Sequence, residues 1–280
     1  MSRRTFQRCF TWQFAAALFV AFGALGNHAA AQTPAAGGTA PTPTAKSGAF
    51  IDLTGYWVSI VDEDWRWRMM TPGKGDYASL PLNKEGRRIA DMWDPAKDER
   101  EGNNCKAYGA ANILRIPERL HITWENDNTL RMDTDAGMQT RLFHFDGSKW
   151  KGGPPQWQGD SVAKWEKQIQ RDEYAAEGFE EQKFSQGTLH VETTHMRPGY
   201  LRKNGVPYSA NATLTEYFDR FEENGEAYLI VTSVVTDPTY LRDKFIISGQ
   251  FRLEPNGAKW NPTPCRPLWP KMTEPPKGGY

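Results

Sequence analysis

The feature that most constrains this chain is a succession of short segments in which apolar and polar residues alternate, each followed by a turn signal. Alternation with a period of two is typical of strands that bury one face. Dipeptides such as Asn224-Gly225 favour the tight turns that join neighbouring antiparallel strands. The predicted strands are residues 52–60, 120–124, 130–132, 139–145, 161–166, 188–195, 212–222, 226–236 and 245–253. Such a chain predicts an all-β, mainly antiparallel sheet that protects its edges by closing into a barrel or folding into a sandwich.

Residues 61–69 show the same alternation, with aromatic side chains on one face and charged ones on the other. Trp65 and Trp67 share the first face, whereas Arg66 and Arg68 share the second. This pattern predicts a further half-buried strand whose charges face solvent. The tryptophans belong either to the core or to a surface on which a ligand stacks.

The sequence predicts little helix. Asn83 can cap a helix over residues 84–93, because its side-chain oxygen can accept from the free backbone N–H groups of the first turn. Residues 167–183 are charged with loosely spaced apolar side chains, which we interpret as an insertion within a hairpin. The chain is therefore expected to carry one or two short helices beside its sheet.

Two resemblances refine the fold. The motif Gly55-Tyr56-Trp57 resembles the G-x-W that opens the first strand of lipocalins and other calycins, which implies a single barrel and leaves the β-sandwich as the alternative. A wider resemblance links the chain to a group of secreted bacterial proteins without assigned function, and it implies export and a β-rich fold but no chemistry. The segments that carry this second resemblance are residues 71–77, 161–166, 193–202, 214–218 and 237–238.

The N-terminal region is typical of an export signal. Residues 1–31 combine an arginine-containing head, an apolar stretch too short to span a membrane comfortably, and a small-residue cleavage site. Arg3-Arg4 in that head resembles a twin-arginine signal, with an ordinary Sec signal as the alternative. We therefore expect a periplasmic or secreted protein, with residues 32–49 as a flexible linker, 50–265 as one barrel-like domain and 266–280 as a Pro-rich tail.

The charge balance excludes one class of partner, and the cysteine content predicts a disulfide. The chain carries 34 basic and 34 acidic residues, and 34 minus the three arginines of the signal leaves 31 basic residues in the mature protein. This balance provides no basic field for nucleic acid. Cys105 and Cys265 are the two cysteines left after the signal, and an even pair in an oxidising compartment predicts one disulfide.

The densest group of polar and aromatic residues lies between positions 193 and 217. His195 ends a predicted strand on the face of core residues, and Glu216 lies on the apolar face of the next strand, so both are candidate catalytic acids or bases. Each also has a structural interpretation: His195 can bond a carbonyl, and Glu216 can pair with Arg220. The loop between the two strands supplies candidate ligand-binding residues, namely Arg197, Tyr200, Arg202 and Tyr208, together with Trp65 and Trp67.

Sequence motifs for metal, phosphate or nucleophilic-serine chemistry are missing from the sequence, so we expect no cofactor and no metal. The favoured function is an exported binding protein that holds a small, largely apolar or aromatic molecule in a barrel cavity. The alternative is a cofactor-independent hydratase, isomerase or lyase that uses His195 or Glu216 in the same cavity. A structural role in the cell envelope is the third hypothesis. We expect neither a nucleic-acid partner nor a transmembrane segment in the mature protein.

Overall fold

The computed structural model describes residues 42–147, 153–167 and 187–266. The chain divides into two units, residues 1–41 and 42–280, and every described residue belongs to the second unit. The long strands of this unit are β1 (Gly55–Ile60), β2 (Arg119–Asn126), β3 (Thr129–Thr134), β5 (Thr140–His144), β6 (Asp160–Lys167), β7 (Gly187–Thr194), β10 (Thr213–Glu223), β11 (Glu226–Thr236) and β12 (Phe245–Glu254).

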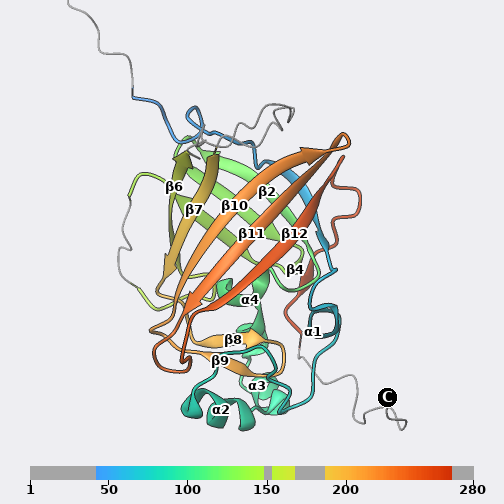
Figure 1. Ribbon diagram of the computed structural model, residues 1–280, viewed down its shortest axis with the longest axis vertical. Helices are drawn as coiled ribbons and strands as arrows, with labels where there is room; N and C mark the ends of the chain where they lie inside the picture. The colour runs from blue at the N-terminus through green and yellow to red at the C-terminus, as the bar shows by residue number, and fades with distance from the viewer. Residues whose placement is uncertain (1–41, 148–152, 168–186, 267–280) are drawn as a thin grey trace, which may run out of the picture. The chain divides into compact units, whose positions relative to one another are not determined.

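Among the described residues, these nine strands close into a barrel in the order β1, β12, β11, β10, β7, β6, β5, β3, β2 (Figure 1). Neighbouring strands are antiparallel except β5 and β6, which run parallel. Asn224 and Gly225 join β10 to β11, and both have the positive φ that a tight hairpin turn requires. The prediction of a mainly antiparallel all-β fold is confirmed, and the fold is a closed barrel rather than a sandwich.

The alternation of the strands determines what lies inside the barrel. On β7, Leu189, Val191 and Thr193 are fully buried. Bulky aromatic side chains complete the interior, and Phe143 of β5 packs against Phe218 of β10 with ring centroids 5.5 Å apart. The fully buried side chains of this core include Trp57, Phe143, Phe218 and Phe251. Because these large side chains meet across the barrel, its interior is a packed core.

The strand predicted at residues 61–69 is wrong. Asp64 adopts a left-handed conformation with φ 50° that ends the extended chain, and α1 (Trp65–Met69) follows. Trp65 is 60% exposed, so it belongs to neither the core nor a strand. Arg68, expected to face solvent, is buried and donates to the backbone carbonyls of Ile60 and Arg115. These tertiary hydrogen bonds outweigh the strand pattern of the local sequence.

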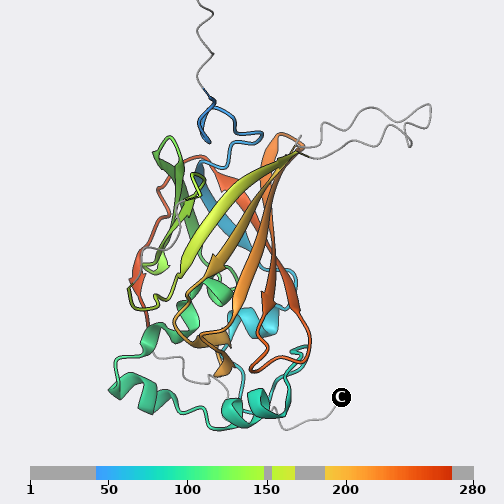
Figure 2. The same cartoon turned by 90° about the vertical axis from the view of Figure 1, so that its left-hand side faces the viewer.

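Helices and a small hairpin form a layer at one end of the barrel, at the bottom in Figures 1 and 2. We call it the end layer; it consists of α2 (Lys84–Asp91), α3 (Pro95–Arg100), the 3-10 helix η1 (Asn104–Tyr108), α4 (Ala110–Ile113), β8 (Gly199–Arg202) and β9 (Val206–Tyr208). The helix expected after Asn83 is confirmed as α2, and the Asn83 side chain accepts from the backbone N–H of Gly86 at 2.8 Å. The segment after His195, expected to be a loop, forms the β8–β9 hairpin.

A disulfide joins the end layer to the C-terminal part of the chain. Cys105 of η1 bonds Cys265, 160 positions later, as predicted. Just before Cys265, β13 (Thr263–Pro264) pairs with β4 (Ala136–Gly137) in parallel. The C-terminal segment is therefore held by a covalent bond to one element and by backbone hydrogen bonds to another.

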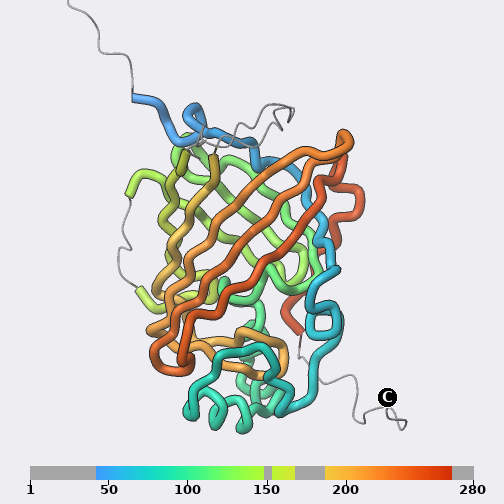
Figure 3. The backbone as a smooth tube through the Cα atoms, in the orientation of Figure 1, coloured from blue at the N-terminus to red at the C-terminus, as the bar shows by residue number. Residues whose placement is uncertain are grey.

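The segment before β1 crosses the opposite end of the barrel, at the top in Figure 3. We call residues 42–54 the strap. Its backbone at Ala45 accepts from the Trp165 indole N–H at 2.8 Å and donates to the Asn128 side chain at 3.0 Å. Residues 42–49, the end of the expected flexible linker, are thus bonded to the barrel. The predicted signal (1–31), most of the insertion at 167–183 and most of the tail (266–280) lie outside the described residues.

Candidate functional site

Glu216, one of the two candidate catalytic residues, lies inside the barrel and is paired. Both of its carboxylate oxygens accept from the guanidinium of Arg141 on β5, at 3.0 and 2.5 Å, and neither side chain is exposed. Arg141 also donates to Thr193 at 3.2 Å. Arg220, the partner considered from the sequence, pairs instead with Glu222. A buried charge needs a partner of opposite charge, and Arg141 and Glu216 provide this for each other inside the barrel.

His195, the other candidate, lies just after the end of β7. Its backbone has φ 54°, and the side chain is 41% exposed. Because the left-handed backbone turns the chain, His195 leaves the enclosed face that Thr193 occupies. The ring Nδ1 lies 2.9 Å from the Thr194 hydroxyl and 3.8 Å from a carboxylate oxygen of Asp160. His195 and Glu216 therefore do not meet in one cavity.

Four candidate ligand-binding residues follow His195, in the segment that was expected to be a loop. They belong to the end layer or pack beside it. The Arg197 guanidinium stacks on Trp157, 4.2 Å from the ring centroid. The Tyr200 hydroxyl donates to Asp98, and burial together with this hydrogen bond raises the pKa of Tyr200. Tyr208 is fully buried, which raises its pKa as well. Tyr200 is thus engaged by Asp98, whereas the buried hydroxyl of Tyr208 has no hydrogen-bond partner among the described residues.

Arg202 and Trp67, both candidate ligand-binding residues, lie against each other. The guanidinium lies 4.7 Å from the centroid of the Trp67 ring and donates to the carbonyls of Asp76 and Ala78. Burial and then the charge of Arg115 lower the pKa of Arg202 to about 10. Trp65, by contrast, lies exposed on α1. The Arg202–Trp67 stack joins the β8–β9 hairpin to the segment that follows β1.

A polar pocket opens in the barrel wall where β5 meets β6. These parallel strands share only two residue pairs, Phe143↔Ser161 and His144↔Val162, so the wall is interrupted beside them. We call this the seam pocket; its volume is about 330 Å³, and it is lined by Gln139, Thr140, Arg141, Leu142, His144, Gln156, Trp157, Gln158, Gly159, Asp160 and Ser161. Sequence reasoning missed it, although Arg141 carried a signal: it is a charged residue on the same strand face as Phe143.

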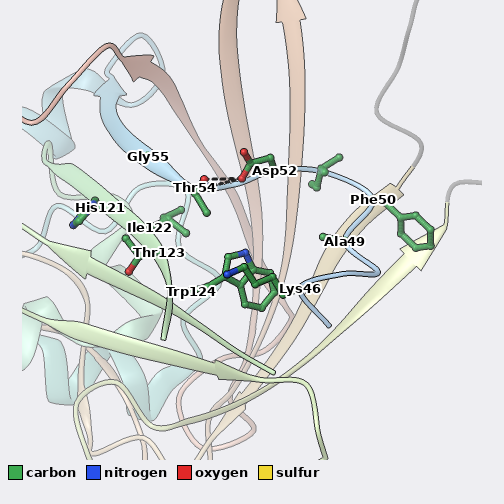
Figure 4. A pocket seen from close by; sticks show the side chains of 11 residues that line it. Lys46, Ala49, Phe50, Asp52, Thr54, Gly55, His121, Ile122, Thr123 and Trp124 are labelled. Atoms are coloured by element: carbon green, nitrogen blue, oxygen red, sulfur yellow. Dashed lines mark hydrogen bonds between the residues drawn. The ribbon is translucent and has the colours of Figure 1, made fainter. Parts of the chain in front are cut away.

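A larger pocket lies at the other end of the barrel, between the strap and β2 (Figure 4). Pairing of β1 with β2 ends at Gly55↔Ile122, whereas β2 continues to Asn126. We call the space beside this free stretch the mouth pocket; its volume is about 670 Å³, and it is lined by Lys46, Ala49, Phe50, Ile51, Asp52, Thr54, Gly55, His121, Ile122, Thr123 and Trp124.

Trp124, which lines the mouth pocket, is the first of three aromatic rings in a row, and the other two do not line the pocket. The Trp124 ring lies 5.7 Å from Phe145, which in turn lies 5.3 Å from Trp165. All three rings pack against the barrel core while remaining partly exposed. Comparison with known family models, curated proteins and solved structures finds no match, so the function is inferred from this geometry.

Proposed function

We propose that the protein binds a small, largely apolar or aromatic molecule in the mouth pocket. The observation that carries this proposal is a pocket of about 670 Å³ lined by Trp124, the first ring of the aromatic row, at the end of a barrel whose interior is packed. Ligand sites of about 300–1,000 Å³ commonly combine an apolar wall with a few polar groups, and they occur in the mouths of β-barrels. The proposed ligand thus lies at the mouth rather than deep within the barrel.

The lining of the mouth pocket supports both affinity and orientation. Trp124, which is partly exposed, and Phe50, which is 43% exposed, supply apolar surface that a hydrophobic ligand would remove from water. Lys46 and Asp52 of the strap supply charged groups at the same pocket. A planar aromatic ligand with one polar substituent matches this arrangement best, because aromatic rings favour offset or edge contacts with one another.

Titration with two fluorescent or quenching probes, indole and 1-anilinonaphthalene-8-sulfonate, tests the proposal. We expect binding of at least one probe, and we expect Trp124→Ala to weaken it roughly tenfold, because an aromatic contact with its buried area contributes on the order of 1–3 kcal/mol. Trp65→Ala is the matched control, since Trp65 is exposed on α1 and does not line the pocket.

The control separates specific binding from surface adsorption. Equal affinities for the parent, Trp124→Ala and Trp65→Ala would contradict binding at the mouth pocket. A lack of binding by both probes, in a protein that retains its near-ultraviolet circular dichroism, would also contradict it.

Export to the periplasm or the exterior belongs to the same proposal. The sequence of residues 1–31 and the disulfide between Cys105 and Cys265 support it, because disulfides persist in oxidising compartments. In the described ranges, no helix has both the length and the apolar character needed to cross a membrane. N-terminal sequencing of the protein from a bacterial host is expected to give a chain that starts at Gln32. An unprocessed Met1 in the cell interior would contradict export.

A cofactor-independent hydratase, isomerase or lyase remains the second candidate. The observation that favours it is the placement of His195 beside Asp160, at 3.8 Å, next to a polar pocket. Glu216 is already engaged by Arg141, which leaves His195 as the candidate acid or base. A screen of hydration, isomerisation and elimination substrates with the parent and His195→Ala tests this candidate. Equal turnover by both proteins would remove His195 from the reaction.

A further inference from the structure

Strand β1 begins too late to pair with the whole of β2. The register Gly55↔Ile122 would place Leu53 opposite Trp124 if β1 began earlier. Instead, the Leu53 carbonyl accepts from the Trp57 indole N–H at 2.9 Å. Gly55 has φ 123°, a conformation that favours glycine and that turns the preceding chain away from β2. The edge of β2 is therefore open at Trp124.

The backbone of Trp124 faces this open edge. In an antiparallel pair, alternate residues of a strand direct both N–H and C=O toward the same neighbour. The Glu118 carbonyl accepts from Ser59 of β1, whereas the Arg119 carbonyl accepts from Asp135, which follows β3. Trp124 lies an even number of positions after Glu118, so its N–H and C=O point to the β1 side. Among the described residues, neither group has a backbone partner there.

The mouth pocket lies beside this edge and adds charge and an aromatic ring to it (Figure 4). The strap bounds the gap at Lys46, whose backbone N–H donates to the Asp127 carbonyl at 3.0 Å. The Lys46 ammonium is exposed and forms no ion pair with the residues that the structure describes. Asp52, the acid of the pocket, instead accepts from the Thr54 N–H and hydroxyl, at 2.9 and 2.7 Å.

We propose that the mouth pocket binds an N-acylated aromatic amino acid, the group found at the C-terminal end of an extended aromatic peptide. Its amide N–H donates to the Trp124 C=O, and a carboxylate oxygen accepts from the Trp124 N–H, as in an added strand. The carboxylate charge pairs with Lys46, and the aromatic ring packs at Trp124. The proposed ligand class rests on the proposed function, because it concerns the same pocket.

Other aromatic ligands use fewer of these groups. An aromatic hydrocarbon would contact the Trp124 ring but would leave the backbone N–H and C=O beside it without partners. An aromatic amine can donate to the carbonyl, but its positive charge would be repelled by Lys46 and would give the N–H no acceptor. An N-acylated aromatic amino acid serves the ring, both backbone groups and the ammonium together.

Amide hydrogen exchange followed by NMR tests the open edge in the full chain. We expect the Trp124 amide to exchange faster than the Ile122 amide, which faces the same side but is covered by Gly55. Saturation with N-acetylphenylalanine is expected to slow exchange at Trp124. Equal protection of the two amides in the free protein, or unchanged exchange at Trp124 on saturation, would overturn the proposal.

Two analogues of N-acetylphenylalanine test its amide and its carboxylate. O-acetyl-phenyllactate lacks the amide N–H and is expected to bind roughly fivefold more weakly. N-acetylphenylalaninamide lacks the charge and is expected to bind about threefold more weakly. Lys46→Gln should weaken the acid to the same extent and leave the affinity for the amide unchanged. Lys74→Gln is the matched control, since Lys74 is exposed and does not line the pocket.

The outcomes separate this ligand class from binding at the mouth pocket in general. Equal affinities for N-acetylphenylalanine and its ester analogue would overturn the proposal, as would equal affinities of the acid for Lys46→Gln and Lys74→Gln. If indole still produces shifts at residues 121–124, the proposed function stands in either case. A lack of shifts there with both indole and N-acetylphenylalanine would overturn the two proposals together.

Discussion

At the scale of single residues, the barrel holds charges that differ in how they are compensated. Arg141 donates two hydrogen bonds to the carboxylate of Glu216. Glu118, the residue before β2, is also buried, at 5% exposure. Within the described ranges, neither carboxylate oxygen of Glu118 has a hydrogen-bond partner. Burial, and then the charge of Asp135, raises the pKa of Glu118 well above its ordinary value of 4.5, although Arg68 and Arg141 oppose the shift. An uncompensated buried acid of this kind makes stability depend on pH.

Glu118→Gln is expected to stabilise the protein at neutral pH. A carboxyl whose pKa is raised by folding binds its proton more tightly in the native state, so its contribution to stability declines as the pH rises above 4.5. The neutral glutamine removes that decline. Urea denaturation should give the variant a free energy of unfolding about 1–3 kcal/mol above that of the parent at pH 7 and close to it at pH 4. A variant that is less stable than the parent at pH 7 would contradict this assignment.

At the scale of elements, the disulfide is a covalent link between parts of the chain that lie 160 positions apart. Cys105 lies in η1 of the end layer, and Cys265 follows the short strand β13. Gln139, which lines the seam pocket, has its side-chain nitrogen 3.6 Å from the sulfur of Cys265. The disulfide therefore holds the C-terminal segment and contacts one residue of the seam pocket, Gln139.

Removal of the disulfide by the paired change Cys105→Ser and Cys265→Ser is expected to lower the free energy of unfolding by about 2–5 kcal/mol. The physical reason is that the bond closes a loop of 160 positions and so restricts the unfolded chain. Urea denaturation of both proteins measures the difference, with the parent under reducing conditions as a second comparison. An unchanged midpoint in both comparisons would show that the bond does not constrain the unfolded state.

The individual elements differ in how well the sequence could predict them. The strands at residues 226–236 and 212–222 were predictable to within about one residue, because their alternation reports a buried face directly. The helix α1 was not, because the left-handed turn at Asp64 and the buried hydrogen bonds of Arg68 depend on distant backbone. The alternation of apolar and polar residues therefore predicts β10 and β11, whereas α1 depends on tertiary contacts.

The candidate site was less predictable than the fold for the same reason. Glu216 was correctly expected on an apolar face, but its partner Arg141 lies 75 positions away and is reached only when the barrel closes. Ser161 and Val162 of β6 meet β5 through a parallel pairing of two residue pairs, and no local sequence motif predicts that pairing. Chemistry that depends on barrel closure cannot be inferred from spacing along the chain.

At the scale of the whole barrel, both pockets lie where hydrogen bonding between neighbouring strands is interrupted. The mouth pocket opens where β1 leaves β2, and the seam pocket opens where β5 and β6 share only two residue pairs. The rest of the barrel encloses a packed core of aromatic and branched side chains. The resemblance to calycins implied a ligand within the barrel, whereas the interior is packed and these two pockets lie at openings of its wall.

The most direct test of binding at the mouth pocket is a protein-observed NMR titration with indole. We predict that the shifts concentrate at the strap and at residues 121–124, while the amides of Phe143 and Phe218 in the core remain unchanged. Shifts concentrated at Phe143 and Phe218 would place the ligand within the barrel and contradict this account. Saturating indole without shifts at the strap would contradict it equally.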